Sequence, residues 1–353
     1  MKKWHRIIPW RLSILVPAMQ TPHPSHMKAH TFPSIFAAAL YLALGLSADA
    51  AEAGATSVLK WKDGKKAVFL LMFDDSAPTD VKTVIPELKK RGMAGTFYVV
   101  PGGGPFKAAQ KAWETELHGP GIVYANHTFT HKGTTTPEQL DEELAKCNEG
   151  IAKCFPGLKQ PRLISFGQPG GVPWTVPKEQ VDAALAKHHL IDRPPFKGYP
   201  INYKTTEAML ALVDTALAKG EMEYNVFHGV GGDWLVTPTE VFTALLDKLE
   251  AHKDELWVTD AISWHQYAAE RKSAEVKVLE AGKDRIRLRL TSKEDPAFYD
   301  LPLTLTTQVP PEWKECCVTQ GGKSITVPAA GGAVRYSAVP GSEEIVIQPA
   351  GGG

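Results

Sequence analysis

The 353-residue sequence has no excess of either charge, because its 39 lysines and arginines match its 39 aspartates and glutamates. No strongly basic block runs through the chain beyond its N-terminal region, so binding to nucleic acid has no electrostatic support. Repeats and low-complexity tracts are also lacking, apart from the closing glycines at 351–353. A hydrophobic share of 43% is ordinary for a globular protein. These features exclude little else and leave a neutral partner, such as a sugar, open.

Cysteine is scarce, with only Cys147, Cys154, Cys316 and Cys317 in the whole chain. The first two are seven residues apart on a predicted helix, which separates them by about 10 Å, too far for a disulfide. The other two are adjacent and therefore hard to join to each other. We expect free or buried thiols, and neither a disulfide framework nor a metal cluster. An unusual bridge between the two regions stays open.

The N-terminal region has the pattern of an export signal. Residues 35–46 form an apolar run of mostly small side chains, and two Ala-x-Ala cleavage patterns follow at 48–50 and 51–53. We predict that residues 1–53 are a signal peptide, with Met27 as a candidate for the true start. Cleavage would give an exported, periplasmic or extracellular protein without a stable membrane span. An uncleaved anchor is the alternative, because the uncharged run is about 20 residues long.

After a linker at 51–57, apolar runs alternate with amphipathic helical stretches. Strands are expected at 67–73, 94–100, 122–125, 163–166, 190–191, 224–227 and 256–259, and helices at 78–91, 137–154, 177–187, 206–219 and 238–252. The repeated strand-then-helix order predicts parallel strands with helical crossovers. The fold class is therefore α/β, a distorted (β/α) barrel of about seven parallel strands over residues 58–272.

Capping residues support several of these boundaries. Thr136 and Thr237 each precede a proline and a glutamine or glutamate at capping-box spacing, which predicts helix starts. Gly92 and Gly220 stand where helices are expected to end. From about residue 275 the pattern changes to strict apolar and polar alternation between glycine and proline turns. We expect residues 275–350 to form a small all-β, sandwich-like domain with antiparallel strands.

Three segments place polar groups directly after an apolar strand, where catalysts and ligands gather in parallel sheets. In the first, Asp74 and Asp75 follow a wholly apolar strand. Neighbouring residues on a strand face opposite ways, so Asp75 must lie in the loop if both carboxylates serve one site. Simple solvation, or a cap for the next helix, is the alternative for this pair.

The second segment ends in His127 and His131, whose spacing suits binding of one metal ion. Alone, two histidines four residues apart are often surface residues, but these follow a strand and accompany the aspartate pair. Two imidazoles and one carboxylate leave coordination positions for water, as in catalytic metal sites. The third segment delivers His228 into a glycine-rich loop, where a structural role and an acid catalyst are equally compatible with the sequence.

Together these segments resemble the polysaccharide deacetylase family, the NodB-like carbohydrate esterases. The run Met72–Pro78 (M-F-D-D-S-A-P) is similar to the family motif T-F-D-D-G-P, with the threonine and glycine changed and one residue inserted. The run Asn126–His131 (N-H-T-F-T-H) matches N-H-T-x-x-H without departure. The run Val226–Gly229 is similar to the late strand that ends in a catalytic histidine. The resemblance covers roughly residues 65–270.

One departure concerns the arginine that orients the base in this family. The expected R-P-P-Y-G motif is replaced at 165–171 by S-F-G-Q-P-G-G, which contains no arginine. The run Arg193–Phe196 (R-P-P-F) is similar to the absent motif but comes one strand later. The sequence thus reads as a variant lacking the usual motif arginine, and Arg193 could either reach the site or be merely structural.

The resemblance implies an exported, metal-dependent hydrolase that removes N- or O-linked acetyl groups from a polysaccharide. Asp75, His127 and His131 would hold one divalent ion, for which we expect Zn²⁺, while Co²⁺, Ni²⁺ and Mn²⁺ are also compatible. Asp74 would act as the general base and His228 as the acid.

Further roles fall on loops beside these motifs. A backbone N–H near Gly170 would hold the oxyanion. Trp174 and Trp234 are candidates for stacking on sugar rings, or else loop anchors buried for their area. Two other functions stay open. One is a metal-dependent amidase of the same barrel acting on small cyclic amides. The other is a non-catalytic carbohydrate-binding protein, made plausible by the absent arginine.

Overall fold

The computed structural model describes residues 52–351. The predicted signal peptide lies almost entirely outside this range, so cleavage and export stay predictions. Within the described range, no helix combines the length and the apolar character needed to cross a bilayer. The described residues belong to one compact unit. The predicted division into 58–272 and 275–350 therefore also stays a prediction.

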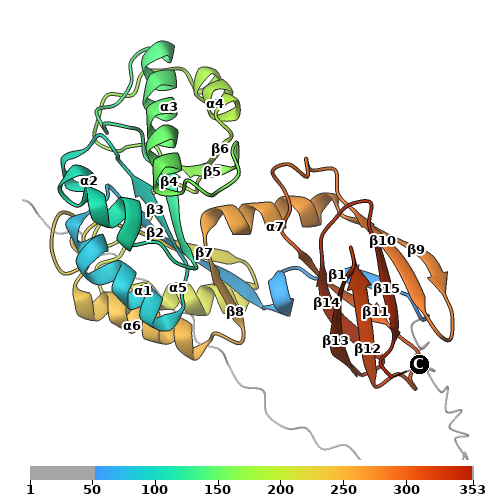
Figure 1. The fold of residues 1–353 in the computed structure, drawn as a ribbon. Coiled ribbons are helices and arrows are strands. Elements are labelled where there is room, and N and C mark those ends of the chain that lie inside the picture. Colours follow the sequence, from blue (N-terminus) through green and yellow to red (C-terminus); the bar gives the residue numbers. More distant parts are fainter. Residues whose placement is uncertain (1–51, 352–353) are drawn as a thin grey trace, which may run out of the picture. The chain divides into compact units, whose positions relative to one another are not determined.

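A sheet of seven parallel strands carries the first part of the described chain (Figure 1). The hydrogen-bonded order is β6-β5-β4-β3-β2-β7, and β8 also pairs with β2. The strands are β2 (Ala67–Asp74), β3 (Gly95–Val99), β4 (Ile122–Asn126), β5 (Ile164–Phe166), β6 (Leu190–Asp192), β7 (Met222–Phe227) and β8 (Leu256–Thr259). All seven lie at the predicted positions.

Helices between these strands cover the sheet. Figure 1 shows α5 and α6 along the part of the sheet that contains β2 and β7, with α3 and α4 beside β4 to β6. The predicted helices are η2 (Asp80–Val84) with α1 (Ile85–Arg91), α3 (Pro137–Cys154), α4 (Lys178–Lys187), α5 (Thr206–Lys219) and α6 (Thr239–Ala251). Short elements that the sequence analysis missed are η1 (Lys62–Gly64), α2 (Gly104–Ala108) and η3 (Ala112–Glu116), together with the longer α7 (Ala261–Ser273).

Strand β2 is the centre of this sheet, because every one of its residues is buried. A parallel strand covered on both sides needs apolar side chains in both directions, which explains its unbroken apolar run. Phe73 stacks on Phe97 and Phe227 from the two neighbouring strands, at 4.8 Å and 5.1 Å between ring centroids. The aromatic stack holds the carboxyl end of β2 in place immediately before Asp74.

The barrel is not closed by a regular ladder, since β6 and β7 are the two ends of the hydrogen-bonded order in the described chain. The segment that follows β6 bridges the gap instead. The Arg193 N–H donates to the Phe166 carbonyl at 2.9 Å, and the Val226 N–H donates to the Lys197 carbonyl at 2.9 Å. The predicted distorted barrel is thus confirmed, and its distortion lies next to the residue Arg193.

Helix boundaries follow the predicted capping chemistry in three of four places. Thr136 accepts a hydrogen bond from the Gln139 N–H, and both Gly92 and Gly220 end helices with left-handed φ angles of 62° and 66°. The expectation for Thr237 is wrong, because α6 begins after Pro238 without a side-chain cap. The Thr237 backbone instead pairs with the loop after β7, where its N–H donates to the Gly229 carbonyl.

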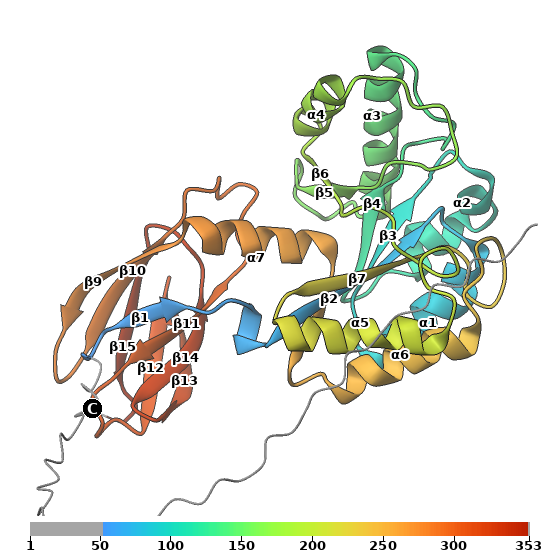
Figure 2. The same ribbon diagram turned by 180° about the vertical axis from the view of Figure 1, so that it is seen from behind.

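The last part of the described chain is antiparallel, as predicted (Figure 2). Its strands are β9 (Glu275–Ala281), β10 (Ile286–Thr291), β11 (Leu303–Gln308), β12 (Glu315–Gln320), β13 (Lys323–Ala330), β14 (Ala333–Ala338) and β15 (Glu344–Pro349). Strand β10 shows the reason: Ile286, Leu288 and Leu290 are fully buried, while the alternating Arg287 and Arg289 pair with Glu344. All four cysteines are free, three of them buried, which confirms the expected thiols.

One expected linker is wrong in part. Residues 56–58 form strand β1 (Thr56–Val58), which pairs antiparallel with β11 at the edge of the all-β sheet. The Thr56 and Thr307 hydroxyls lie 2.8 Å apart across this pair. A three-residue strand is too short for a periodic signal, so the strand could not be predicted from the sequence. The start of the described chain is therefore bound to residues about 250 positions later.

A prediction concerns Glu270 of α7, a carboxylate that is only 1% exposed. Burial, followed by the nearby Asp300, raises the pKa of Glu270 to about 7. The folded state thus holds this proton more tightly than the unfolded state, so stability falls as pH rises from about 4.5 to 7. We expect Glu270→Gln to raise the free energy of unfolding at pH 8 by about 1–3 kcal/mol and to change little at pH 5.

Urea unfolding at the two pH values measures this difference, with Glu149→Gln, an exposed glutamate of α3, as the control. An equal pH dependence of stability in the wild type and Glu270→Gln would contradict the prediction.

Candidate active site

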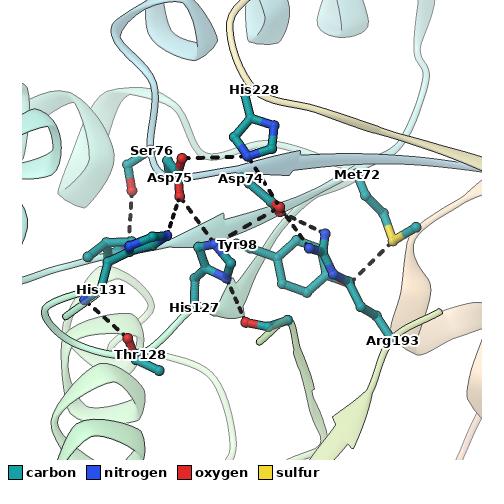
Figure 3. Close-up of polar contacts among 12 residues, drawn as sticks. Met72, Asp74, Asp75, Ser76, Tyr98, His127, Thr128, His131, Arg193 and His228 are labelled. Atoms are coloured by element: carbon teal, nitrogen blue, oxygen red, sulfur yellow. Dashed lines mark hydrogen bonds and ion pairs between the residues drawn. The ribbon is translucent and has the colours of Figure 1, made fainter. Parts of the chain in front are cut away.

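The functional side chains gather at the carboxyl ends of the parallel strands. Asp74 is the last residue of β2, and His127 and His228 follow β4 and β7 directly. Figure 3 shows their side chains pointing toward one another from these three strands. The carboxyl edge of a parallel sheet collects such groups because all its strands run the same way. The structure therefore brings together residues up to 154 positions apart in the chain.

Asp75 reaches the same place because the backbone turns sharply after β2. Its φ angle is 74° and that of Ser76 is 54°, both in the left-handed region. The turn is held by two hydrogen bonds, from the Asp75 N–H to the Tyr98 carbonyl at 3.1 Å and from the Val100 N–H to the Ser76 hydroxyl at 2.9 Å. Asp75 thus lies in the loop, as the sequence analysis required for a shared site.

Two histidines face one oxygen of Asp75. The distances from Asp75 Oδ1 are 3.2 Å to His127 Nε2 and 3.1 Å to His131 Nε2 (Figure 3). His127 Nδ1 lies 2.6 Å from the Gly167 carbonyl and must donate to it, which leaves Nε2 with a lone pair. A carbonyl that binds the far nitrogen of the ring fixes the imidazole orientation that a metal ion needs.

The loop that carries His131 is held by side chains from α3 and β4. The Glu143 carboxylate accepts from both the N–H and the hydroxyl of Thr130, each at 2.7 Å. The Asn126 side chain accepts from the Thr128 N–H, and the Thr128 hydroxyl accepts from the His131 N–H. The role of Glu143 could not be predicted from the sequence. In a helical pattern, a glutamate that binds a loop cannot be told from one that faces solvent.

The donor set fits a divalent ion. One ligand atom each from Asp75, His127 and His131 lies within 4.8 Å of the others. Asp75 Oδ1 is buried without a hydrogen-bond partner in the described chain, although it faces both imidazoles. Burial alone would raise the pKa of Asp75, but the two histidines that face it hold the pKa far below the ordinary value. A charged carboxylate and two imidazoles form a ligand set that suits Zn²⁺ and similar ions.

Asp74 is held by an arginine, so of the two roles left open for Arg193 the structure supports the one at the site. Arg193 donates from Nη1 and Nη2 to the two Asp74 oxygens, each at 2.7 Å. Burial opposes the charge of the guanidinium, yet Asp74 outweighs it and the pKa of Arg193 is raised. The guanidinium carbon also lies 4.3 Å from the centre of the Tyr98 ring. Arg193 follows β6, one strand later than the family motif.

His228 stands across the site from the histidine pair. Its Nε2 lies 3.6 Å from Asp75 Oδ2 and 3.9 Å from Asp74 Oδ2. Burial lowers the pKa of His228, against the attraction of the two carboxylates. Its ring is tilted against Phe196, with 5.3 Å between centroids. The imidazole therefore has one edge toward both aspartates, while its ring contacts a half-buried apolar neighbour.

These groups line a cavity of about 580 Å³. Gly170 and Trp234 border it, as the sequence analysis expected of residues that contact substrate. Trp174 does not border it, so its role as a stacking residue is wrong. Trp174 packs instead against the apolar core, 6.3 Å between centroids from Phe166. The remaining lining residues are Asp74, Asp75, His127, His131, Gln168, Gly171, Arg193, Phe196, Ile201, His228 and Leu235.

Comparison with known proteins agrees with this site. Residues 62–185 match the family model described as polysaccharide deacetylase. This segment contains the aspartate pair and both histidines of the ligand triad. The resemblance to the polysaccharide deacetylase family, a family of hydrolases, is thus confirmed over residues 62–185.

A curated relative, the gellan lyase of a Bacillus species, is 24% identical over 315 residues, which is 77% of this chain and 12% of that protein. The chain thus spans only a small part of that relative.

Solved structures with low similarity include a family 4 carbohydrate esterase from Streptomyces lividans in complex with acetate. It is 20% identical, with 56% of this chain and 94% of that chain covered and a TM-score of 0.41. The catalytic domain of a peptidoglycan N-acetylglucosamine deacetylase from Eubacterium rectale is 16% identical, covers 58% and 92%, and has a TM-score of 0.42. A family pseudoenzyme from Bacillus anthracis is 16% identical, covers 54% and 61%, and has a TM-score of 0.39.

The pairing of Asp74 with Arg193 yields a prediction about stability. Both side chains are almost fully buried, at 3% and 5% exposure, so loss of one partner leaves the other charge uncompensated. We expect Arg193→Leu to lower the free energy of unfolding by about 3–5 kcal/mol. In an Asp74→Asn background the same change should cost much less, because no buried carboxylate remains. Urea unfolding of the four proteins measures both costs, and equal costs would show that the pair is not coupled.

Proposed function

We propose that the protein is an exported, metal-dependent hydrolase that removes acetyl groups from a polysaccharide. The observation that carries this proposal is the arrangement of two carboxylates around one histidine. Asp75 Oδ1 lies 3.2 Å from His127 Nε2, and the arginine-held Asp74 Oδ2 lies 4.0 Å from the same atom. Asp75 is thus one of the three ligand residues. The neighbouring Asp74 is held in place by Arg193 and is not one of the ligands.

A divalent ion held by Asp75, His127 and His131 would lower the pKa of a water molecule and polarise an acyl carbonyl. Asp74, which is outside the ligand triad, would act as the general base that takes a proton from water in the cavity. Arg193 fixes the orientation of the Asp74 carboxylate through its two parallel hydrogen bonds. A base held in this way needs no reorganisation when the reaction begins.

His228 is placed to give a proton to the departing amine or alkoxide, since its Nε2 faces the same carboxylates. Backbone N–H groups of the loop at Gly170 border the cavity and are candidates to hold the oxyanion. Trp234 is 38% exposed and borders the cavity, as a sugar-stacking residue would. Zn²⁺ is the ion we propose, since two imidazoles and one carboxylate are its common catalytic ligands.

Three further points support a secreted polysaccharide deacetylase. The N-terminal run at 35–46 with its Ala-x-Ala patterns is the support for export. The family model and the name of the curated relative both refer to polysaccharides. The reason for a non-catalytic carbohydrate-binding protein was the absent arginine, and Arg193 removes that reason. A small-amide amidase stays possible on the ligand set alone, and substrate assays separate it from the proposal.

The first functional prediction concerns the ion and the substrate together. Acetate release from acetylated xylan, chitin oligomers, peptidoglycan and gellan should occur with at least one polymer, disappear after treatment with a chelator, and return with Zn²⁺. His127→Ala should stay inactive after Zn²⁺ is added, while His252→Ala at the half-buried C-cap of α6, outside the cavity, behaves as the wild type. Release from none of the polymers, with hydrolysis of small cyclic amides instead, would favour the amidase.

The second functional prediction concerns the base. Asp74→Asn keeps the shape of the side chain but cannot accept the proton, so kcat should fall by about 10²–10⁴-fold. Metal content should stay near that of the wild type, because Asp74 is not in the ligand triad. Measured kcat and metal content by elemental analysis check the two statements. Full activity in Asp74→Asn would remove Asp74 from the mechanism.

A further inference from the structure

Trp234 makes a contact that sugar stacking does not explain. Its indole Nε1 donates a hydrogen bond to Asp75 Oδ2 at 2.6 Å. The other oxygen of the same carboxylate, Oδ1, faces His127 and His131. The two oxygens of Asp75 therefore have different partners. Oδ2 accepts from the indole, and Oδ1 faces the two histidines. A hydrogen bond to an ionised carboxylate is also stronger than one between neutral groups.

The loop that carries Trp234 is held in one conformation by its own backbone. The Gly229 N–H donates to the Trp234 carbonyl at 2.9 Å, and the Thr237 N–H donates to the Gly229 carbonyl at 2.8 Å. Any side chain at Gly229 would collide with the loop, since a Cβ there would lie 1.9 Å from the Gly232 carbonyl oxygen. The loop is thus closed on itself at Gly229, and the indole has little freedom to move away.

The same loop is bound to the segment that follows Asp75. The Asp233 carboxylate accepts from the Thr79 N–H at 2.8 Å, and the Thr79 hydroxyl accepts from the Val230 N–H at 3.1 Å. Asp233 has a φ angle of 66°, a strained conformation for a residue other than glycine, which these contacts maintain. The donor Trp234 and the acceptor Asp75 are therefore fixed with respect to each other before any ligand arrives.

We propose that Trp234 is a positioning residue for the metal ligand Asp75, which rests on the metal site of the proposed function. Its N–H engages Oδ2 and so presents Oδ1 alone to the ion. Without this donor the carboxylate can rotate about its terminal bond or offer both oxygens. Groups that orient a metal ligand in this way contribute about 10- to 100-fold to metal affinity. This role uses the edge of the indole ring, so its exposed face stays available to a sugar.

The test is the affinity for Co²⁺ of the metal-free protein, measured by competition with a chelator. Trp234→Phe keeps an aromatic ring but removes the N–H, and we expect it to raise the Kd by about 10- to 100-fold. The matched control is Trp174→Phe, since Trp174 lies outside the cavity and should leave the Kd unchanged. Equal Kd values for the wild type and Trp234→Phe would overturn the inference and leave the metal site intact. Failure of the wild type to bind Co²⁺ would overturn the metal site itself.

A second variant and a spectrum separate positioning from mere packing. Trp234→Gln loses the ring but retains an N–H donor, so its Kd should lie closer to that of the wild type than the Kd of Trp234→Phe. The visible absorption of bound Co²⁺ should weaken in Trp234→Phe, because a carboxylate that offers both oxygens increases the coordination number. An unchanged spectrum in Trp234→Phe, or weaker binding by Trp234→Gln than by Trp234→Phe, would assign the effect to ring packing and overturn the proposal.

Discussion

The buried ion pair between Asp74 and Arg193 is the contact on which the site depends. An unpaired charge at this depth would be very costly. Two parallel hydrogen bonds from the guanidinium provide Asp74 with an opposite charge and fix the direction of its carboxylate. The irregular closure of the barrel follows from the same need. The chain after β6 leaves the regular ladder to bring Arg193 over the sheet and then contacts β7. The same segment after β6 therefore both distorts the barrel and orients the base.

Much of this arrangement could be predicted from the sequence, because it depends on local pattern. An apolar strand that ends in two carboxylates, and a strand followed by two histidines, place their side chains at one edge of a parallel sheet without further knowledge. The position of Arg193 could not be predicted in the same way. It depends on the register of β5 with β6, where Phe166 pairs with Asp192, and three-residue strands carry no pattern that sets a register. Trp174 was misjudged for a similar reason, since adjacency in sequence to a site loop says nothing about which way a ring packs.

Gly167 shows how the two halves of the site are joined. Its carbonyl accepts from His127 Nδ1 at 2.6 Å and so turns the other imidazole nitrogen, Nε2, toward Asp75. Its lack of a side chain admits the arginine, since a Cβ would lie 2.7 Å from Arg193 Nε and 2.9 Å from the Tyr98 ring. The backbone of Gly167 thus orients the metal ligand His127. Because Gly167 has no side chain, it also leaves room for Arg193. In a chain where the arginine comes from the next strand, a glycine at this position is what allows the metal ligands and the base to share one edge of the sheet.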